Sequence, residues 1–234
     1  MLGTIVNALA VVAGSLLGLI FRGGIPDKYN RTIMHAISLA VILIGMMSAL
    51  KVQNLLLVIM SMVIGSILGE YWKIEDRLTN LGNLLESRFA KYGNGISKGF
   101  VTASLVFCVG SMAIVGSLES GLTGNHQTLF AKSILDGISS IVFASSMGIG
   151  VMFSAAAIFL YQGFITVTAV FMKQFLIDAV ITEMTAVGGL LIVALGFNML
   201  EMSKIKVANM LPAIFIPLVY FMIHIGLGHF GIRW

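Results

Sequence analysis

Residues 2–21, LGTIVNALAVVAGSLLGLIF, decide the fold class, because this run contains no charged side chain. A helix of about 20 apolar residues is long enough to cross the hydrocarbon core of a bilayer. Lipid offers the backbone no hydrogen-bond partner, so a spanning segment is either a helix or a strand of a closed barrel. The uninterrupted run favours a helix, since barrel strands alternate. No basic region precedes the run, so we interpret it as a span and not as a cleavable signal peptide.

The composition of the whole chain extends this interpretation. The 234 residues are 58% hydrophobic and 10% charged, whereas about a quarter of the residues in soluble domains are charged. So few charges cannot cover a globular surface, and lipid must cover it. The formal net charge of +4 is explained by basic cytoplasmic loops, so no nucleic-acid partner is expected. The single cysteine, Cys108, gives neither a disulfide framework nor a cysteine metal site, and no cofactor is predicted.

Apolar runs separated by charges predict an all-α, polytopic transmembrane helical bundle of seven or eight spans. The eight candidate helices cover residues 2–21, 32–50, 53–70, 98–117, 133–148, 151–173, 179–200 and 207–227. No charge marks a turn at Met147–Gly150. If 133–173 forms one broken or re-entrant element near Gly148–Gly150, the count falls to seven. Pro212 and Pro217 predict a bend in the last span.

The apolar runs and the polar stretch between them divide the chain into three predicted segments: a three-helix membrane segment (1–70), a connector (71–97) and a membrane segment of about five helices (98–234). The connector is the main polar stretch. Its apolar positions recur at three- and four-residue steps, which predicts an amphipathic helix at the membrane surface; they are Leu78, Leu81, Leu84, Leu85 and Phe89.

The basic residues predict the orientation. Ten of the 14 Lys and Arg residues fall in the odd-numbered loops of the eight-span topology; the others are Lys51, Lys132, Lys173 and Arg233. Because cytoplasmic loops are rich in Lys and Arg, the odd-numbered loops are expected in the cytoplasm and both termini outside. The expected location is a cytoplasmic (inner) membrane.

A faint internal repeat relates residues 32–60 to 182–210. At an offset of 150, six of the 29 positions are identical, and one extra residue also pairs Gly45 with Gly196. In the eight-span topology the two copies are inverted relative to each other across the membrane. Inverted repeats are common in secondary transporters. Shared apolar composition is the alternative explanation of the matches.

Two acidic residues inside apolar segments are the main functional candidates, because ionisable groups in a span cost about 2.5 kcal/mol or more at the bilayer centre and usually face a cavity or a partner. Asp136 shares a face with Ser133, Gly137 and Ser140, and Ser139 is adjacent. That face could hold a solute or cation. The alternative is close helix packing through small residues.

Glu183 is followed by Thr185 and a glycine pair near the start of a span. Carboxylate and hydroxyl oxygens suit a hard cation or a proton relay; the identity of any metal stays open. The alternative is that Glu183 caps a helix N-terminus and complements its dipole. Asn198 and Asn7 are candidates either for the same polar site or for hydrogen bonding between helices.

Other polar and small residues complete the candidates. Tyr161 and Gln162, which precede Gly163, are further pore-lining candidates. Gly14-Ser15-x-x-Gly18 in the first span is echoed by Gly65-Ser66-x-x-Gly69 in the third. Small residues four apart favour close helix crossing. They predict packing within the chain and make a homodimer through these Gly/Ser faces plausible.

Three separated motifs carry a family resemblance: Gly3-Thr4-Ile5-Val6-Asn7 with Gly14-Ser15-Leu16-Leu17-Gly18, Leu135-Asp136-Gly137 leading to Gly148-Ile149-Gly150-Val151, and the segment 182–189 with Leu211-Pro212-Ala213. With them the chain resembles, over essentially its whole length, the YdfK/YqgA-like bacterial membrane proteins, catalogued as domain of unknown function 554. The resemblance implies a bacterial or archaeal membrane location. It transfers no site.

The residues favour a secondary transporter of a small solute or ion, coupled to a cation or proton, with a polar site near the midplane. Its expected residues are Asp136, Glu183, Ser139, Ser140, Thr185, Asn198 and Asn7. The alternative is a passive channel using the same polar face. An intramembrane enzyme or a membrane scaffold fits less well, and no catalytic residue is assigned. The expected partners are membrane lipid and the small solute or ion.

Overall fold

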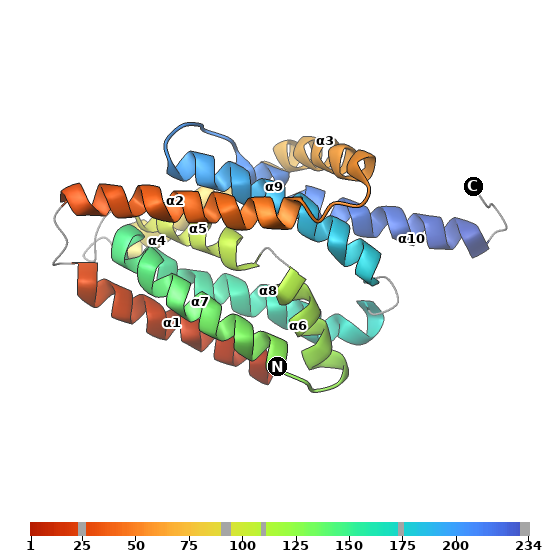
Figure 1. The fold of residues 1–234 in the computed structure, drawn as a ribbon, viewed down its shortest axis with the longest axis horizontal. Helices are drawn as coiled ribbons and strands as arrows, with labels where there is room; N and C mark the ends of the chain where they lie inside the picture. The colour runs from red at the N-terminus through yellow and green to blue at the C-terminus, as the bar shows by residue number, and fades with distance from the viewer. Residues whose placement is uncertain (23–26, 90–94, 109–110, 173–175, 230–234) are drawn as a thin grey trace.

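A computed structural model describes residues 1–22, 27–89, 95–108, 111–172 and 176–229 of the chain. Within these ranges the chain is all-helical (Figure 1). The elements are α1 (Leu2–Arg22), α2 (Asp27–Ala49), α3 (Leu55–Trp72), α4 (Ile74–Arg88), α5 (Ile96–Cys108), α6 (Ser111–Leu122), α7 (Gln127–Met147), α8 (Gly150–Met172), α9 (Asp178–Met199), the 3₁₀ helix η2 (Val207–Phe215) and α10 (Ile216–His229). Lys173 and Arg233, which entered the loop comparison, lie outside the described residues.

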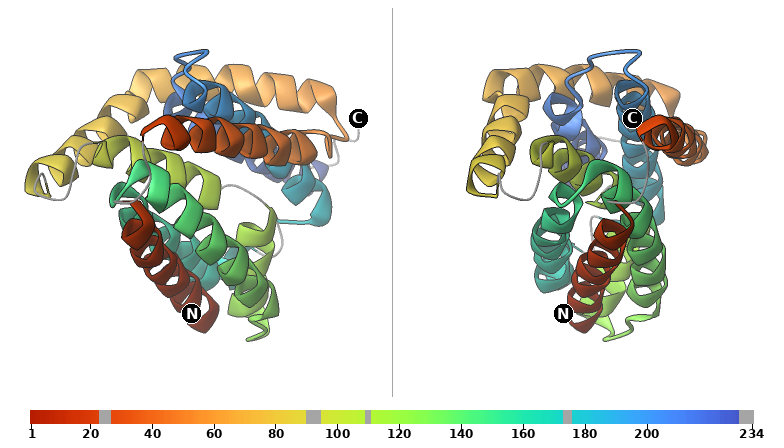
Figure 2. Two further views of the ribbon diagram at one scale, coloured as in Figure 1. Left: turned by 60° about the vertical axis from the view of Figure 1, so that its left-hand side comes forward. Right: turned by 90° about the vertical axis from the view of Figure 1, so that its left-hand side faces the viewer.

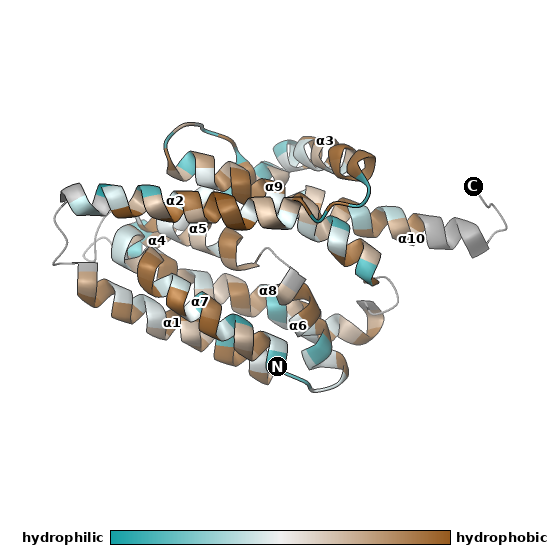
Figure 3. Ribbon diagram, in the orientation of Figure 1, coloured by the Kyte–Doolittle hydropathy of each residue, from teal (hydrophilic) through white to brown (hydrophobic). Residues whose placement is uncertain are grey.

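Six of the described helices are long and apolar enough to cross a membrane, and brown colouring dominates most of them in Figure 3. They are Leu2–Phe21, Arg31–Ala49, Leu55–Trp72, Gln127–Met147, Gly150–Phe171 and Asp178–Met199. Helices α5 and α6 pass the same test as a pair bent by 62°, which would make a seventh span. The expected seven or eight spans are therefore six or seven by length and composition.

Two of the expected spans, 207–227 and 98–117, are not single straight helices in the structure. The segment predicted at 207–227 is apolar, but its first part, η2, is a 3₁₀ helix containing Pro212. Proline removes a backbone donor and clashes with the preceding turn, which accounts for the 3₁₀ geometry; the bend expected there stays a prediction. The segment predicted at 98–117 is longer and is divided between α5 and α6 around residues 109–110, which lie outside the described part of the chain. That division was not expected.

Glycine and an asparagine set two of the helix boundaries. Gly148, with φ of 79°, ends α7, and α8 begins at Gly150. The chain thus turns here between two helices that are each long enough to span, and residues 133–173 do not form the single broken or re-entrant element that was the alternative. Asn54 begins α3 by accepting a hydrogen bond from the Leu57 N–H at 3.0 Å. The amphipathic helix predicted in the connector is α4, in which Gly82 is buried while Leu81 and Leu84 are exposed.

The helices form two groups that interleave along the sequence. The first group contains α1, α6, α7 and α8, with α5 against α8; the second contains α2, α3, α9, η2 and α10. Figures 1 and 2 show these groups as two layers, with α4 at the edge. Helices of segment 1–70 thus pair with helices of segment 98–234, so each group is closed only after the second half of the chain has folded.

Glycines allow the closest helix pairs in both groups. A Cβ at Gly14 would collide with the Gly137 carbonyl and the Ser140 hydroxyl of α7, and a Cβ at Gly69 would collide with the Asn209 backbone of η2. The Gly/Ser motifs of α1 and α3 therefore serve packing within the chain, as predicted. A homodimer stays a prediction, and its contact would need other faces of the helices.

We expect Gly14→Ala to destabilise the protein more than Gly137→Ala, although both replace a helix glycine on the same α1–α7 contact. At Gly137 the added Cβ meets Ala10, with the carbonyl oxygen at 3.4 Å and the Cβ at 3.5 Å, and both are ordinary contacts. Overpacking costs about 1–3 kcal/mol, while the gain in helix propensity is the same for both variants. Thermal unfolding of the detergent-purified variants measures the difference; equal unfolding temperatures would contradict the close α1–α7 contact.

Candidate functional site

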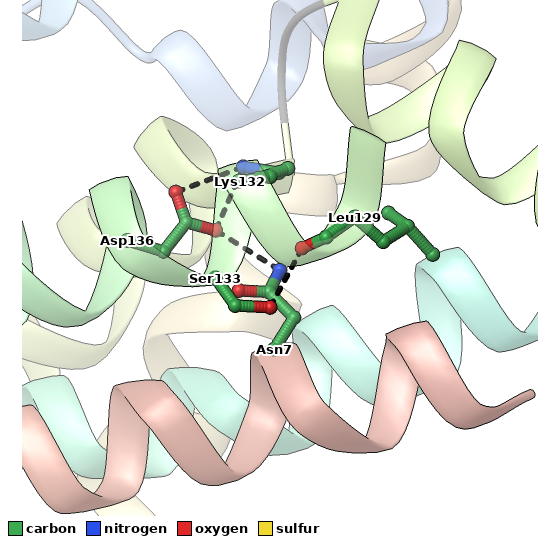
Figure 4. Close-up of polar contacts among 5 residues, drawn as sticks. All are labelled: Asn7, Leu129, Lys132, Ser133 and Asp136. Carbon is green, nitrogen blue, oxygen red and sulfur yellow. Dashed lines mark hydrogen bonds and ion pairs between the residues drawn. The ribbon is translucent and has the colours of Figure 1, made fainter. Parts of the chain in front are cut away.

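A buried ion pair lies at the centre of the first helix group. Lys132 Nζ donates to Asp136 Oδ1 at 2.9 Å and to Oδ2 at 2.7 Å, one turn along α7. Asn7 Nδ2 of α1 donates to Asp136 Oδ2 at 3.0 Å. Figure 4 shows the three side chains converging between the helices. Lys132 is 7% exposed, Asp136 6% and Asn7 0%, so this triad is closed off from solvent.

Lys132 lies inside α7 and not in a loop, so its predicted position was wrong. It was counted as a loop residue because the span was expected to begin at residue 133, whereas α7 begins at Gln127 and Lys132 lies inside it. The missed signal was the spacing of four residues between Lys132 and Asp136, which puts both on one helix face. The carboxylate is therefore neutralised by its own helix. Lys132 also drops out of the loop charges that set the predicted orientation.

The neighbours of the triad are tied to the backbone or to helix packing. Ser133 donates to the Leu129 carbonyl at 2.6 Å (Figure 4), and Ser140 donates to the Gly137 carbonyl at 2.7 Å. Ser140 packs against Gly14, which fits the alternative of close helix packing. Ser139 is only half-buried on the same helix. Of the predicted site residues, the structure brings Asn7, Asp136 and Ser140 to the α1–α7 contact.

Glu183 lies in the second helix group and caps a helix. Its Oε1 accepts the backbone N–H groups of Gln53 at 3.1 Å and Asn54 at 2.7 Å, directly before α3. Unpaired N–H groups at a helix N-terminus favour a carboxylate. This is the predicted capping alternative, except that Glu183 caps α3 and not its own helix. Its Oε2 is buried and has no hydrogen-bond partner among the described residues.

Thr185 and Asn198 of α9 do not join Glu183 in one site. The Thr185 hydroxyl donates to the Ile181 carbonyl at 2.6 Å. Asn198 holds the turn after α9, because its Oδ1 accepts from the Ser203 hydroxyl and the Ile205 N–H while its Nδ2 donates to the Ile205 carbonyl. Asn198 also lines a cavity of about 380 Å³ beside α4 and α5. It is a structural residue at the end of its helix.

A polar network fixes η2 to the junction of α3 and α4. Asn209 Nδ2 donates to Glu70 Oε2 at 2.6 Å, and Asn209 Oδ1 accepts the Glu75 N–H at 2.6 Å. Glu75 Oε2 accepts the Ala208 N–H at 2.9 Å. Lys206 Nζ donates to Glu70 Oε1 at 2.8 Å, and this hydrogen bond raises the pKa of Lys206 because it stabilises the charged ammonium. The network explains why a 3₁₀ segment is held in place.

No metal cluster forms among the described residues: no three His, Cys, Asp or Glu side chains lie close enough to hold an ion. The acidic residues Asp178 and Glu201 are exposed, and Glu201 lies 3.9 Å from Lys98. Among the described residues, the buried charged side chains are Lys132, Asp136 and Glu183. The interior charge of the first group is thus one positive and one negative side chain in direct contact.

Comparison with known proteins identifies the family. The model of the family described as "Protein of unknown function (DUF554)" matches residues 2–222. The chain belongs to the DUF554 family. This DUF554 chain is 37% identical over 241 residues to the uncharacterized membrane protein YdfK of Bacillus subtilis (strain 168), covering 100% of both chains. It is 27% identical over 222 residues to the uncharacterized protein YqgA of Escherichia coli (strain K12), covering 93% of this chain and 94% of the relative.

The predicted family resemblance is confirmed, and the protein is a multi-pass membrane protein with bacterial homologues. No solved structure matches the chain. The DUF554 family description assigns no activity, so the triad and Glu183 have to be interpreted from their own geometry.

We expect Lys132→Met and Asp136→Leu to destabilise the protein singly and much less in combination. Removing one partner of a buried pair leaves an uncompensated charge and costs about 3–5 kcal/mol, whereas replacing both with apolar residues is often neutral. A double-mutant cycle of thermal unfolding in detergent measures the coupling. Additive losses would contradict a direct, buried ion pair.

Glu183→Gln should keep the stability of α3, since a carboxamide oxygen still accepts both N–H groups, while Glu183→Leu should lower it. Each buried N–H left without a partner costs about 1–3 kcal/mol. Thermal unfolding and protease resistance of the 50–54 loop measure the loss. If both variants unfolded alike, Glu183 would have no capping role.

Proposed function

We propose that this DUF554 protein is a secondary transporter of a small solute or ion in the bacterial cytoplasmic membrane, with the Lys132–Asp136 pair as its coupling element. The burial of this pair carries the proposal. A lysine and an aspartate inside a membrane segment are costly even when paired, and such residues usually belong to solute or proton pathways. The pair does not cap a helix and does not bridge a loop, so packing alone gives no reason for its charge.

The chemistry of the triad suits a coupled cycle. Asp136 is held by both Lys132 and Asn7, so its carboxylate has two donors that can be exchanged. A proton or cation arriving at Asp136 would compete with the Lys132 ammonium. An ammonium released in this way would need a new partner, which a solute can provide. Occupancy by the ion and occupancy by the solute thereby depend on each other, and this dependence is the physical basis of coupling.

Two irregular helical segments, one in each helix group, support the proposal. The bent α5–α6 pair belongs to the first helix group, and the η2–α10 segment with its 3₁₀ turn belongs to the second. Secondary transporters commonly build their sites from discontinuous helices, whose half-helix ends present free backbone groups. The α5–α6 pair is such a discontinuous helix, and η2 adds a stretch of 3₁₀ geometry in the other group.

The faint repeat has a geometric counterpart. Helices α2 and α9 are antiparallel, with Gly45 packed against Gly189 and Gly196 packed against Ser38. The alignment with one extra residue pairs Gly45 with Gly196 and Ser38 with Gly189. Applied to the Gly45–Gly189 contact, this pairing gives the Gly196–Ser38 contact. An approximate two-fold axis through this helix pair accounts for both contacts, and inverted repeats in transporters are related by such an axis.

Access of water to the triad from both membrane sides tests the proposal without knowledge of the solute. Cys108, the single cysteine, lies at the end of α5 within electrostatic range of Lys132 and Asp136. In a transporter that exposes its site alternately, an impermeant thiol reagent should modify Cys108 from either side of oriented vesicles. The measurement is mass spectrometry of the labelled chain, with Cys108→Ser as the unlabelled control. Absence of labelling from both sides would overturn the proposal.

Flux measurements separate a transporter from a passive channel. In proteoliposomes with a pH gradient, a coupled transporter accumulates its solute against a gradient, whereas a channel only equilibrates it. The Lys132→Met/Asp136→Leu double variant should lose accumulation more than about tenfold, a barrier change of about 1.4 kcal/mol or more. Lys98→Met/Glu201→Leu, which removes an exposed pair, is the matched control and should transport normally. Normal accumulation by the triad variant would exclude the pair from the mechanism.

A further inference from the structure

Four fully buried side chains of the first helix group have polar atoms without partners in the described part of the chain. They are Asn7 and Ser15 of α1, Ser117 of α6 and Gln162 of α8, each 0% exposed. The unpaired atoms are Asn7 Oδ1, Ser15 Oγ, Ser117 Oγ and both amide atoms of Gln162; Ser15 lies two turns beyond Asn7, away from the other two residues. Native interiors pair nearly all buried polar groups, so several unpaired atoms in one region require an explanation.

Helix directions place Ser117 beside Gln162. The α6–α7 hairpin is antiparallel, because Thr128 Oγ1 donates to Glu119 Oε2 at 2.6 Å directly across the connecting turn. Helix α8 also runs opposite to α7, so α6 and α8 run in the same general sense, with α6 slanting steeply across α8 in Figure 1. Gly121 of α6 packs against Thr166 of α8. One turn back along both helices, Ser117 and Gln162 reach the same level.

Asn7 reaches this level from the opposite side. The Thr4 and Thr166 hydroxyls are 3.4 Å apart, and α1 runs opposite to α8 (Figure 1). One turn forward from Thr4 is Asn7, and one turn back from Thr166 is Gln162. The two amides are therefore level with each other. Since Asn7 Nδ2 binds Asp136 while its Oδ1 stays free, Asn7 connects the ion pair to the unpaired group.

We propose that Gln162, Ser117 and Asn7 form the binding site of a small uncharged solute with a carboxamide-type edge, that is, a donor and an acceptor side by side. Gln162 offers this edge itself, because its Nε2 donates and its Oε1 accepts, so the two amides can pair through two hydrogen bonds. Ser117 adds a donor, and Asn7 Oδ1 adds an acceptor. The assignment rests on the proposed transport function in treating this solute as the cargo.

The charge of the site argues against a bare ion. All three residues are neutral, and the adjacent Lys132 and Asp136 cancel each other. An ion entering this interior would lose its hydration without a counter-charge, which is costly in a low-dielectric environment. An uncharged solute has only its hydrogen bonds to replace, and the unpaired atoms supply them.

The test compares thermal unfolding of the purified wild-type protein and Gln162→Met, with and without millimolar acetamide as the probe. A binder of the folded state raises the unfolding temperature. We expect acetamide to stabilise the wild type and not the variant, whereas sodium chloride, ammonium chloride and sodium acetate should give no Gln162-dependent shift. Without probe, Gln162→Met should itself unfold about 2–4 °C higher, because it removes unpaired buried atoms.

Two serine variants provide the matched control. Ser117→Ala should reduce the acetamide shift, and Ser154→Ala should not, because the Ser154 hydroxyl is equally buried on α8 but already donates to the Val151 carbonyl at 2.7 Å. A Gln162-dependent shift with a charged probe only, or with no probe at all, overturns the proposal. So does a lower unfolding temperature of Gln162→Met. Binding is measured here without flux, so a positive result combined with an unlabelled Cys108 would reject transport and keep the site.

Discussion

The carboxylate of Asp136 has to be neutralised where it lies, because it is buried and the surrounding interior stabilises isolated charge poorly. Lys132 does this from one turn away, and Asn7 adds a hydrogen bond from another helix. This second contact needs α1 and α7 to lie close together, which the glycine at position 14 permits. The packing of the first helix group and the state of its charge pair thus depend on each other.

The second group meets a similar demand differently. Glu183 has no cationic partner; its carboxylate accepts two N–H groups at the start of α3, where the helix dipole favours negative charge. One acid is neutralised by a charge and the other by a helix end. Only the first arrangement pairs the acid with a side-chain ammonium, and for that reason the proposed transport mechanism is placed at Lys132 and Asp136 and not at Glu183.

The sequence predicted several residues of the site, but not how they contact one another. Asp136, Glu183 and Asn7 stand out in the sequence because polar groups in apolar runs are costly, and all three are buried. The sequence did not predict that Asp136 and Asn7 lie in one helix group and Glu183 in the other. Asn198 looked equivalent to Asn7, yet it holds a turn after α9. Lys132 was missed because a hydropathy analysis places a lysine at the edge of a span. In the structure Lys132 lies one helical turn from Asp136 and neutralises it inside the span.

The sequence by itself determined the membrane class, the helical character and the positions of the apolar segments, because these follow from local composition and from the need of the backbone to satisfy its own hydrogen bonds in lipid. It also located the glycines that bring helices together. Tertiary structure alone decided which helices pair, since α1 meets α7 and α2 meets α9 across more than 100 residues of chain. Contacts between distant segments depend on the geometry of helix surfaces, and a single sequence does not contain that geometry in any local pattern.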